Sequence, residues 1–369
     1  MKTDLFKGDR NSNLELLRII AMILIVISHY SVHGSIKSID LGFGLNKVIL
    51  DISNFGNLGV ALFVMISGYF LVTKPFKLDR IIRVVLDTLF YSVAFFVIFS
   101  ILNHEFSVVS MIRAIFPIVP MQYWFVTTYV FMMMLSPFLN RFLKGLTEYE
   151  FKVYILVMLL IVSISSMIPK FDAFSYSGFL GQFFLYYSLG AFIKIHPKSC
   201  NKIKNPKCYL LISLVLLLLL IMSGVVIDLL SNYFSVFVGE YSFFFGRGSI
   251  LVIAIAYALF KYFTNIKPYE NKFINIVSSC TFGVYLIHDN NYMREYLWGN
   301  IFDNSKYAES NYLIVHFILS VIIVYVACTV IEYIRKYVLE KYVFKNIINR
   351  INSCADSMYG KLLSLIEKR

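Results

Sequence analysis

The sequence predicts an all-α, polytopic membrane protein with about ten transmembrane helices and both termini in the cytoplasm. Of its 369 residues, 59% are hydrophobic and only 15% are charged, whereas soluble proteins average about 25% charged residues. The mean hydropathy is +0.72. Long apolar stretches recur along the chain, and the segments between them differ sharply in their content of basic residues. These observations exclude a soluble globular protein.

Ten stretches are long and apolar enough to be read as membrane-spanning helices, for which about 20 residues are needed. They fall near residues 14–35, 56–73, 82–102, 121–139, 152–169, 178–195, 208–228, 243–263, 273–289 and 312–334. The stretch MIRAIFPIVP, before the fourth span, is short and interrupted by proline, which predicts an interfacial or re-entrant piece. We therefore expect one transmembrane domain over residues 1–339. Residues 340–369 are too polar to span and predict a cytoplasmic amphipathic tail.

The distribution of basic residues sets the expected topology. With the N-terminus inside, 26 of the 34 lysines and arginines fall on the cytoplasmic side, six fall outside and two lie within spans. Cytoplasmic segments of membrane proteins carry this excess. The net charge of +12 is thus a topology signal and predicts no nucleic-acid partner. The five cysteines show no metal-binding spacing, so no metal site is expected.

The first span, LELLRIIAMILIVISHYSVHG, carries both Arg18 and His29. Ionisable groups within a membrane span are costly and are therefore candidates for function. Eleven positions make three helical turns plus about 20°, so the two side chains share a face and lie roughly 16 Å apart along the axis. His33 follows one turn after His29 and could share this face. The alternative is a snorkelling arginine and a packed histidine.

A pair of arginines, Arg80 and Arg83, stands at the cytoplasmic mouth of the third span. They are helix neighbours three positions apart, and the guanidinium fork matches phosphate oxygens. With Arg18 on the same side of the membrane, they could hold a donor that carries phosphates. Ordinary topology-setting charge explains an RxxR pattern equally well.

Three candidates for contact with a polar acceptor lie at the outer ends of the second and fourth spans. They are Asn57, Tyr123 and Trp124. The aromatic pair could stack on a sugar ring, although an interfacial aromatic belt is the commoner role for such residues.

Two further spans place polar groups towards the outside. Arg247, in FFFGRGS, lies one or two turns into the eighth span, and His288 with Asp289 ends the ninth. The basic inner cluster suits an anionic cytoplasmic donor. The outer histidines and aromatics suit a neutral acceptor that carries hydroxyl groups.

These stretches together resemble the acyltransferase-3 family of membrane acyltransferases. The resemblance rests on Arg18 with His29, on the RxxR pair, on FGNLGVALFVMISGYFL, on Trp124-Phe125, and on YLIH ending at His288. These motifs occur in order over nearly the whole chain. The chain lacks a WSLxxE-type pattern and a fused SGNH-type hydrolase domain, which points to the branch similar to capsule and exopolysaccharide O-acetyltransferases.

The resemblance implies an enzyme of the bacterial cytoplasmic membrane. It would move an acetyl group from cytoplasmic acetyl-CoA, a co-substrate, to a hydroxyl of a cell-surface or lipid-linked polysaccharide, with no cofactor and with membrane lipid as its surroundings. In this interpretation His29 and Arg18 are catalytic, and Arg80 and Arg83 bind the donor. The residues expected to bind the acceptor are Asn57, Tyr123, Trp124, Arg247 and His288.

Chemistry supports the role of a histidine, because a sugar hydroxyl needs a base and an imidazole has an unperturbed pKa of about 6.5. The spacing makes donor binding the favoured role of Arg18 over oxyanion stabilisation. Three alternatives stay open: a transporter or flippase, a polymerase of surface glycan, and a succinyl-type acyltransferase. The absence of an internal repeat disfavours a transporter.

Overall fold

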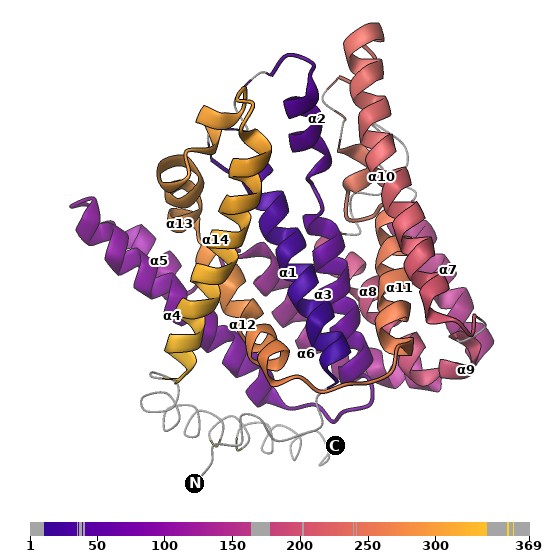
Figure 1. The fold of residues 1–369 in the computed structure, drawn as a ribbon. Helices are drawn as coiled ribbons and strands as arrows, with labels where there is room; N and C mark the ends of the chain where they lie inside the picture. Colours follow the sequence, from indigo (N-terminus) through magenta and orange to yellow (C-terminus); the bar gives the residue numbers. More distant parts are fainter. Residues whose placement is uncertain are drawn as a thin grey trace.

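The structure is a computed structural model, and it describes residues 11–34, 36, 39, 41–163, 178–200, 203–238, 240, 242–337, 353 and 357. These residues form helices and connecting loops, and they contain no β-strand. Figure 1 shows the long helices packed side by side. The principal helices are α1 (Ser12–Val32), α2 (Leu45–Ile52), α3 (Gly56–Leu71), α4 (Leu78–Leu102), α5 (Val108–Ile115), α6 (Trp124–Gly145), α7 (Glu148–Ser163), α8 (Gly178–Ile195), α10 (Pro206–Phe234), α11 (Ile250–Asn265), α12 (Lys272–His288) and α14 (Leu313–Ile334).

Each of the ten expected spans overlaps one of these helices, and the all-α prediction is confirmed for the described residues. The eighth begins later than expected, because α11 starts at Ile250, so Arg247 lies in the loop before this helix and not within the span. Within the described part of the chain, five helical segments are long and apolar enough to cross a membrane. They are Ser12–Val32, Leu45–Leu71, Leu78–Leu102, Pro206–Phe234 and Leu313–Tyr337. The protein is thus a multi-pass membrane protein. The number of ten spans and the cytoplasmic termini stay predictions.

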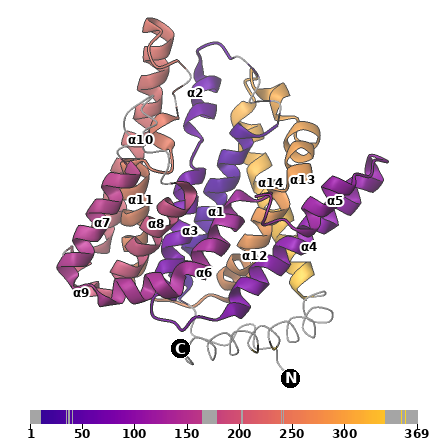
Figure 2. The same ribbon diagram turned by 180° about the vertical axis from the view of Figure 1, so that it is seen from behind.

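Two expectations fall wholly or partly outside the described residues. The amphipathic tail over 340–369 does so except for Ser353 and Ser357, and the fifth span does so after Ser163. The piece before the fourth span begins within the eight-residue helix α5. Its apolar side chains, such as Val109 and Ile112, are exposed, as expected for a segment at the membrane interface. In Figure 2, α4 and α5 extend away from the other helices.

Helix α1 lies at the centre of the bundle and contacts α3, α11, α12 and α14. Small residues bring the neighbouring backbones close. A β-carbon on Gly59 of α3 would collide with the carbonyl oxygen of Ala21 on α1. Gly68 of α3 and Gly190 of α8 face the backbone of each other's helix in the same manner. Glycines permit such contacts in membranes, where packing and not hydrophobic burial drives association.

The start of α1 is fixed against the start of α12. Asn11 caps α1 by accepting a hydrogen bond from the backbone N–H of Asn13. The Ser12 hydroxyl donates to Asn275 over 2.8 Å, and the Ser12 backbone N–H donates to the carbonyl of Tyr269 over 3.0 Å. Both helices then rise by the same 1.5 Å per residue. The end of α1 therefore meets the end of α12, which brings together the histidines of the two helices.

Candidate active site

A cavity of about 1030 Å³ runs between α1, α3, α4, α6 and α12. Its inner end, at the starts of α1 and α4, is basic and is lined by Arg18, Lys74, Arg80 and Lys336. Its outer end is polar and is lined by Ser28, His29, His33, Asn54, Asn57, Arg247, Asp289 and Arg294. Apolar side chains line the middle, among them Met22, Val60, Phe63 and Met133. One cavity therefore contains both residues of the arginine–histidine pair of α1.

At the outer end, His29 of α1 meets His288, the last residue of α12. The His29 Nδ1 and the His288 Nε2 lie 2.9 Å apart. The His288 Nδ1 lies 2.6 Å from the carbonyl oxygen of Val284. His288 is fully buried, whereas the His29 side chain keeps 14% of its surface exposed towards the cavity. His29 is thus the accessible member of the pair, and His288 lies behind it.

These contacts define which ring nitrogen of His29 can accept a proton. The Val284 carbonyl only accepts, so the His288 Nδ1 must carry a proton and donate it. In a neutral His288, the Nε2 is then an acceptor, and the His29 Nδ1 must be the donor. The lone pair of a neutral His29 therefore lies on its Nε2. The hydrogen-bond network assigns this tautomer, in which His29 can act as a base through Nε2.

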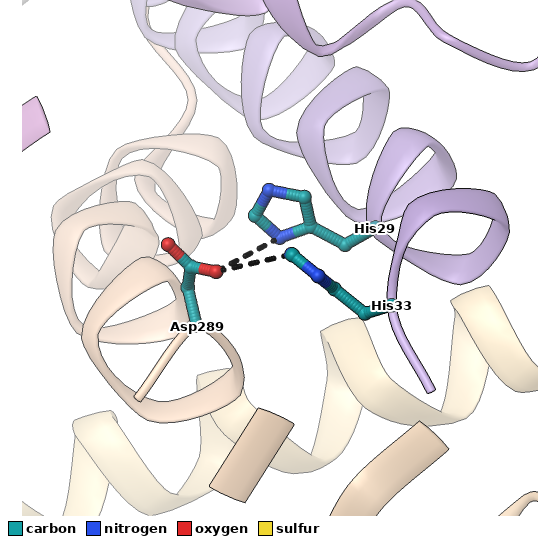
Figure 3. A group of neighbouring side chains, drawn as sticks. All are labelled: His29, His33 and Asp289. Atoms are coloured by element: carbon teal, nitrogen blue, oxygen red, sulfur yellow. Dashed lines mark ion pairs between the residues drawn. The ribbon is translucent and has the colours of Figure 1, made fainter. Parts of the chain in front are cut away.

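Asp289, the residue after α12, provides a carboxylate beside His29. Its Oδ1 lies 3.6 Å from the His29 Nδ1 and 3.4 Å from the His33 Nε2. Figure 3 shows the imidazoles of His29 and His33 pointing towards this oxygen. Arg294 forms an ion pair with the same Oδ1 over 2.8 Å and also donates to the Asp289 carbonyl over 3.1 Å. Asp289 is 1% exposed, so a charge that forms on His29 has a buried counter-ion at hand.

The same residues include a possible metal-binding set. Ligand atoms of His29, His33 and Asp289 lie within 4.8 Å of one another, and two imidazoles with a carboxylate suit several transition metals. The Arg294 guanidinium, however, occupies the carboxylate oxygen that faces both imidazoles. The His29 Nδ1 is also engaged with His288. Arg294 and His288 thus already engage two of the atoms that a cation would use.

At the inner end, Arg18 is held by Glu15, one turn earlier on α1. The Arg18 Nη1 lies 2.8 Å from both oxygens of the Glu15 carboxylate, which also accepts from the Ser278 hydroxyl of α12. The Arg18 guanidinium also lies 5.6 Å from the centre of the Phe70 ring. Arg80 donates to the carbonyl of Pro75 over 3.1 Å and, like Arg18, lines the cavity.

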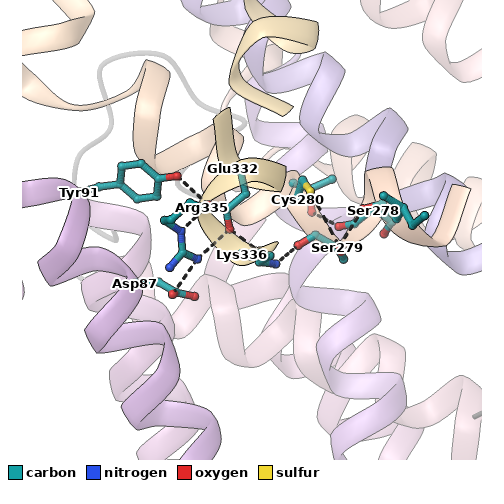
Figure 4. Close-up of polar contacts among 10 residues, drawn as sticks. Asp87, Tyr91, Ser278, Ser279, Cys280, Glu332, Arg335 and Lys336 are labelled. Atoms are coloured by element: carbon teal, nitrogen blue, oxygen red, sulfur yellow. Dashed lines mark hydrogen bonds and ion pairs between the residues drawn. The ribbon is translucent and has the colours of Figure 1, made fainter. Parts of the chain in front are cut away.

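Lys336, beyond α14, completes the basic inner end and is held by a buried polar cluster (Figure 4). The Lys336 ammonium donates to the Ser279 carbonyl and lies 3.5 Å from Glu332. The Glu332 carboxylate also accepts from Arg335 over 2.7 and 2.9 Å and from the Tyr91 hydroxyl over 2.6 Å. This cluster joins α4, α12 and α14 at one depth and positions Lys336 at the cavity wall.

Arg247 reaches the outer end from the loop between α10 and α11. Its guanidinium lies against two neighbouring aromatic rings, 4.5 Å from the centre of the Trp124 ring and 4.3 Å from that of Phe179. The Tyr186 hydroxyl donates to the Arg247 carbonyl. The Asn57 amide donates over 2.9 Å to the carbonyl of Phe245, two residues earlier. The backbone on which Arg247 stands is thus fixed from both α3 and α8.

Three of the residues expected at the site do not line the cavity. Tyr123 is 1% exposed; its hydroxyl donates to the Leu286 carbonyl and accepts from Asn290. His288 is buried behind His29. Arg83 is exposed at the start of α4 and lies outside the cavity lining. Tyr123 and His288 therefore lie where they can orient neighbours, and the direct contact with an acceptor expected of them lacks geometric support.

The chain was also compared with known proteins. The model of the acyltransferase domain of the acyltransferase-3 family matches residues 11–333. The chain belongs to the acyltransferase-3 family. It is accordingly a membrane acyltransferase, and the transferase function expected from the motifs is confirmed. No curated protein and no solved structure matches the chain significantly.

In this acyltransferase the cavity also contains polar residues that the sequence did not place there. His33 was only a possible neighbour of His29, and Asp289 had no assigned role. The sequence did not predict the contact of Arg294 with Asp289. It also did not predict that Lys336 lines the inner end of the cavity. For His33 the sequence does carry a signal, because residues four positions apart on a helix share a face and His33 follows His29 by four. No periodic pattern links Arg294 to Asp289, because their contact depends on the turn after α12.

Proposed function

We propose that this acyltransferase moves an acetyl group from cytoplasmic acetyl-CoA to a hydroxyl of a cell-surface or lipid-linked polysaccharide in the bacterial cytoplasmic membrane. One observation carries the proposal: a single cavity joins a basic end at Arg18 and Arg80 to an imidazole base at His29. A donor held by its phosphates at one end can present its acyl group near the other. Donor binding and base catalysis can therefore take place within one domain.

The inner end supports a phosphate-bearing donor. Arg18, Lys74, Arg80 and Lys336 surround it, and guanidinium and ammonium groups form strong charge-assisted bonds with phosphate. The apolar middle of the cavity suits the pantetheine arm and the methyl group of an acetyl thioester. Arg18 stands with this group, roughly three turns from His29. We assign it to donor binding, in keeping with the spacing on α1.

The outer end supports general-base catalysis. The His29 Nε2 takes the proton of the acceptor hydroxyl as the oxygen attacks the thioester carbonyl carbon. The resulting imidazolium lies beside the Asp289 carboxylate, which compensates its charge. When the tetrahedral intermediate collapses, the carbon–sulfur bond breaks and His29 returns the proton to the CoA sulfur. The products are an acetyl ester and free CoA thiol, and His29 regains its starting state.

A direct test compares purified protein in vesicles with acetyl-CoA and an acceptor glycan. His29→Gln should reduce ester formation at least about a hundredfold while leaving the amount of folded protein unchanged. His104→Gln is the matched control, because His104 is exposed outside the cavity lining. Unchanged transfer by H29Q would overturn the role of His29.

The substrates are tested by mass spectrometry of the surface polysaccharide with and without the gene. Loss of acetyl esters alone supports the proposal. Loss of succinyl esters would indicate the succinyl-type reaction, and shortened chains would indicate a polymerase. If the glycan has the same acyl esters and the same length with and without the gene, a transport function would be favoured and the proposed acetyl acceptor would be contradicted.

A further inference from the structure

Arg247 differs from Arg18 and Arg294, two other arginines of the cavity, in its pairing. Arg18 forms an ion pair with Glu15, and Arg294 forms one with Asp289. Over the described residues, no carboxylate forms an ion pair with Arg247. Its guanidinium is half-buried within the bundle of a membrane protein. A partly buried charge that lacks a counter-ion is costly, and such groups in membrane proteins generally serve a substrate.

The surroundings of the guanidinium fix its orientation. Trp124 comes from the first turn of α6 and Phe179 from the first turn of α8, and their rings lie within 4.5 Å of the guanidinium carbon. The aromatic rings compensate part of the charge through cation–π attraction. Over the described residues, no protein group accepts a hydrogen bond from this guanidinium, so its N–H donors are available to a ligand. A planar fork of this kind matches the two oxygens of a carboxylate or phosphate.

The loop that carries Arg247 is fixed before any ligand binds. Tyr186 donates to the carbonyl of Arg247 itself, and Asn57 donates to that of Phe245. Arg247, Asn57 and Trp124 all line the cavity, at the same end as His29. An anionic group bound at Arg247 would therefore belong to the molecule whose hydroxyl faces His29. Preorganised donors of this kind bind without a large entropic cost.

We propose that Arg247 binds an anionic group of the acceptor, so that the enzyme acetylates an acidic glycan in preference to its neutral counterpart. The inference rests on the proposed acetyl transfer and adds the acceptor's charge class. It also replaces the neutral acceptor expected from the sequence. The anion is an oxyanion with paired oxygens, either the carboxylate of an acidic sugar or the phosphate that links a sugar to its lipid carrier.

The first experiment measures binding and needs no catalysis. Purified protein is titrated with a uronic acid glycoside and its uncharged methyl ester, and with an isoprenyl sugar phosphate and the matching phosphate-free glycoside. We expect the anionic member of one pair to bind about tenfold more tightly, as a charge-assisted hydrogen bond implies. The preferred pair identifies carboxylate or phosphate. Equal binding within both pairs would overturn the inference.

The second experiment assigns the preference to Arg247. Arg247→Gln should reduce the tenfold preference to nearly none, while binding of the neutral member stays unchanged and shows that the variant is folded. Arg247→Lys should retain part of the preference, because it keeps the charge and loses the planar fork. Arg113→Gln is the matched control, since it removes an exposed arginine of α5 outside the cavity lining. A preference that survives in R247Q contradicts the role of Arg247.

Acetyl transfer with the same four acceptors separates this inference from the proposed function. If the anionic acceptor binds through Arg247 but receives no acetyl group, the acceptor class stands and the proposed reaction fails. If both members of each pair are acetylated at equal rates and bind equally, the reaction stands and the inference fails.

Discussion

Around Asp289 the outer end of the cavity holds charged groups in a closed network, whereas the inner end presents cations at its rim. At the outer end, His29, His33 and Arg294 converge on one carboxylate that is almost fully buried. At the inner end, Lys74 is exposed and Arg80 contacts only a backbone carbonyl in the hydrogen bonds described for it. Proton transfer needs atoms fixed within a few tenths of an ångström, while binding of phosphates needs charge more than exact geometry. The two ends differ as these tasks require.

The largest effect should follow from breaking the outer network at its base. His29→Gln removes the lone pair that accepts the acceptor's proton, so the rate of acetyl transfer should fall by about 10²- to 10⁴-fold. The KM for acetyl-CoA should change little, because the donor is bound at the other end. Steady-state kinetics in vesicles measure both quantities. A rise in the KM for acetyl-CoA without a loss of kcat would reverse the assignment of the two ends.

A smaller loss is expected when the base is kept and its counter-ion is neutralised. Asp289→Asn retains the shape of the side chain but removes the charge beside the His29 Nδ1, so kcat should fall by about 10- to 100-fold. Glu295→Gln, which neutralises an exposed carboxylate on the short helix after α12, should leave kcat unchanged. If D289N retains full activity, Asp289 serves only to hold Arg294.

At the inner end, removal of one cation should act on donor affinity. Arg80→Gln should raise the KM for acetyl-CoA by about tenfold with kcat nearly unchanged, which corresponds to one charge-assisted hydrogen bond. Arg83→Gln should raise it less, because Arg83 lies outside the cavity lining. Arg141→Gln removes an exposed arginine of α6 and is the control. Equal effects of R80Q and R83Q would restore the paired clamp expected from the sequence.

The smallest effect is expected from Lys336. Its ammonium already contacts Glu332 and the Ser279 carbonyl, so Lys336→Gln should raise the KM for acetyl-CoA only about threefold, in the range of a weak surface charge pair. The effect should weaken further with added salt. Lys272→Gln, at the start of α12, is the matched control. A large fall in kcat for K336Q would place Lys336 at the reaction rather than at the donor's phosphates.

The sequence predicted the helices well because each is defined by its own residues. It also placed Arg18 and His29 on one face of α1, since the helical repeat converts spacing directly into direction. The same rule does not say which neighbour a face meets. Arg80 and Arg83 are one turn apart, yet only Arg80 lines the cavity. How α4 packs against α6 and α12 decides this, and that packing is a property of the whole bundle.

The outer site was harder to predict because its partners come from distant parts of the chain. The contact between His29 and His288 joins residues 259 positions apart. It depends on the register between α1 and α12 that Ser12 and Asn275 help to fix. Tyr123 and His288 were expected to face a ligand because they stand at the ends of spans. Their polar atoms instead bond to the backbone of α12 and to neighbouring side chains, which holds the ends of the helices in place.

The apolar middle of the cavity has a consequence for the membrane that contains it. A water-filled passage between the basic end and the imidazole end would let ions and protons leak across the bilayer. Side chains such as Met22, Val60 and Phe63 line this passage, and an apolar constriction resists filling by water. In the proposed reaction, this apolar segment would let two substrates from opposite sides meet while it limits the leak of ions. Only an uncharged acyl group and its thioester arm would cross the insulating segment.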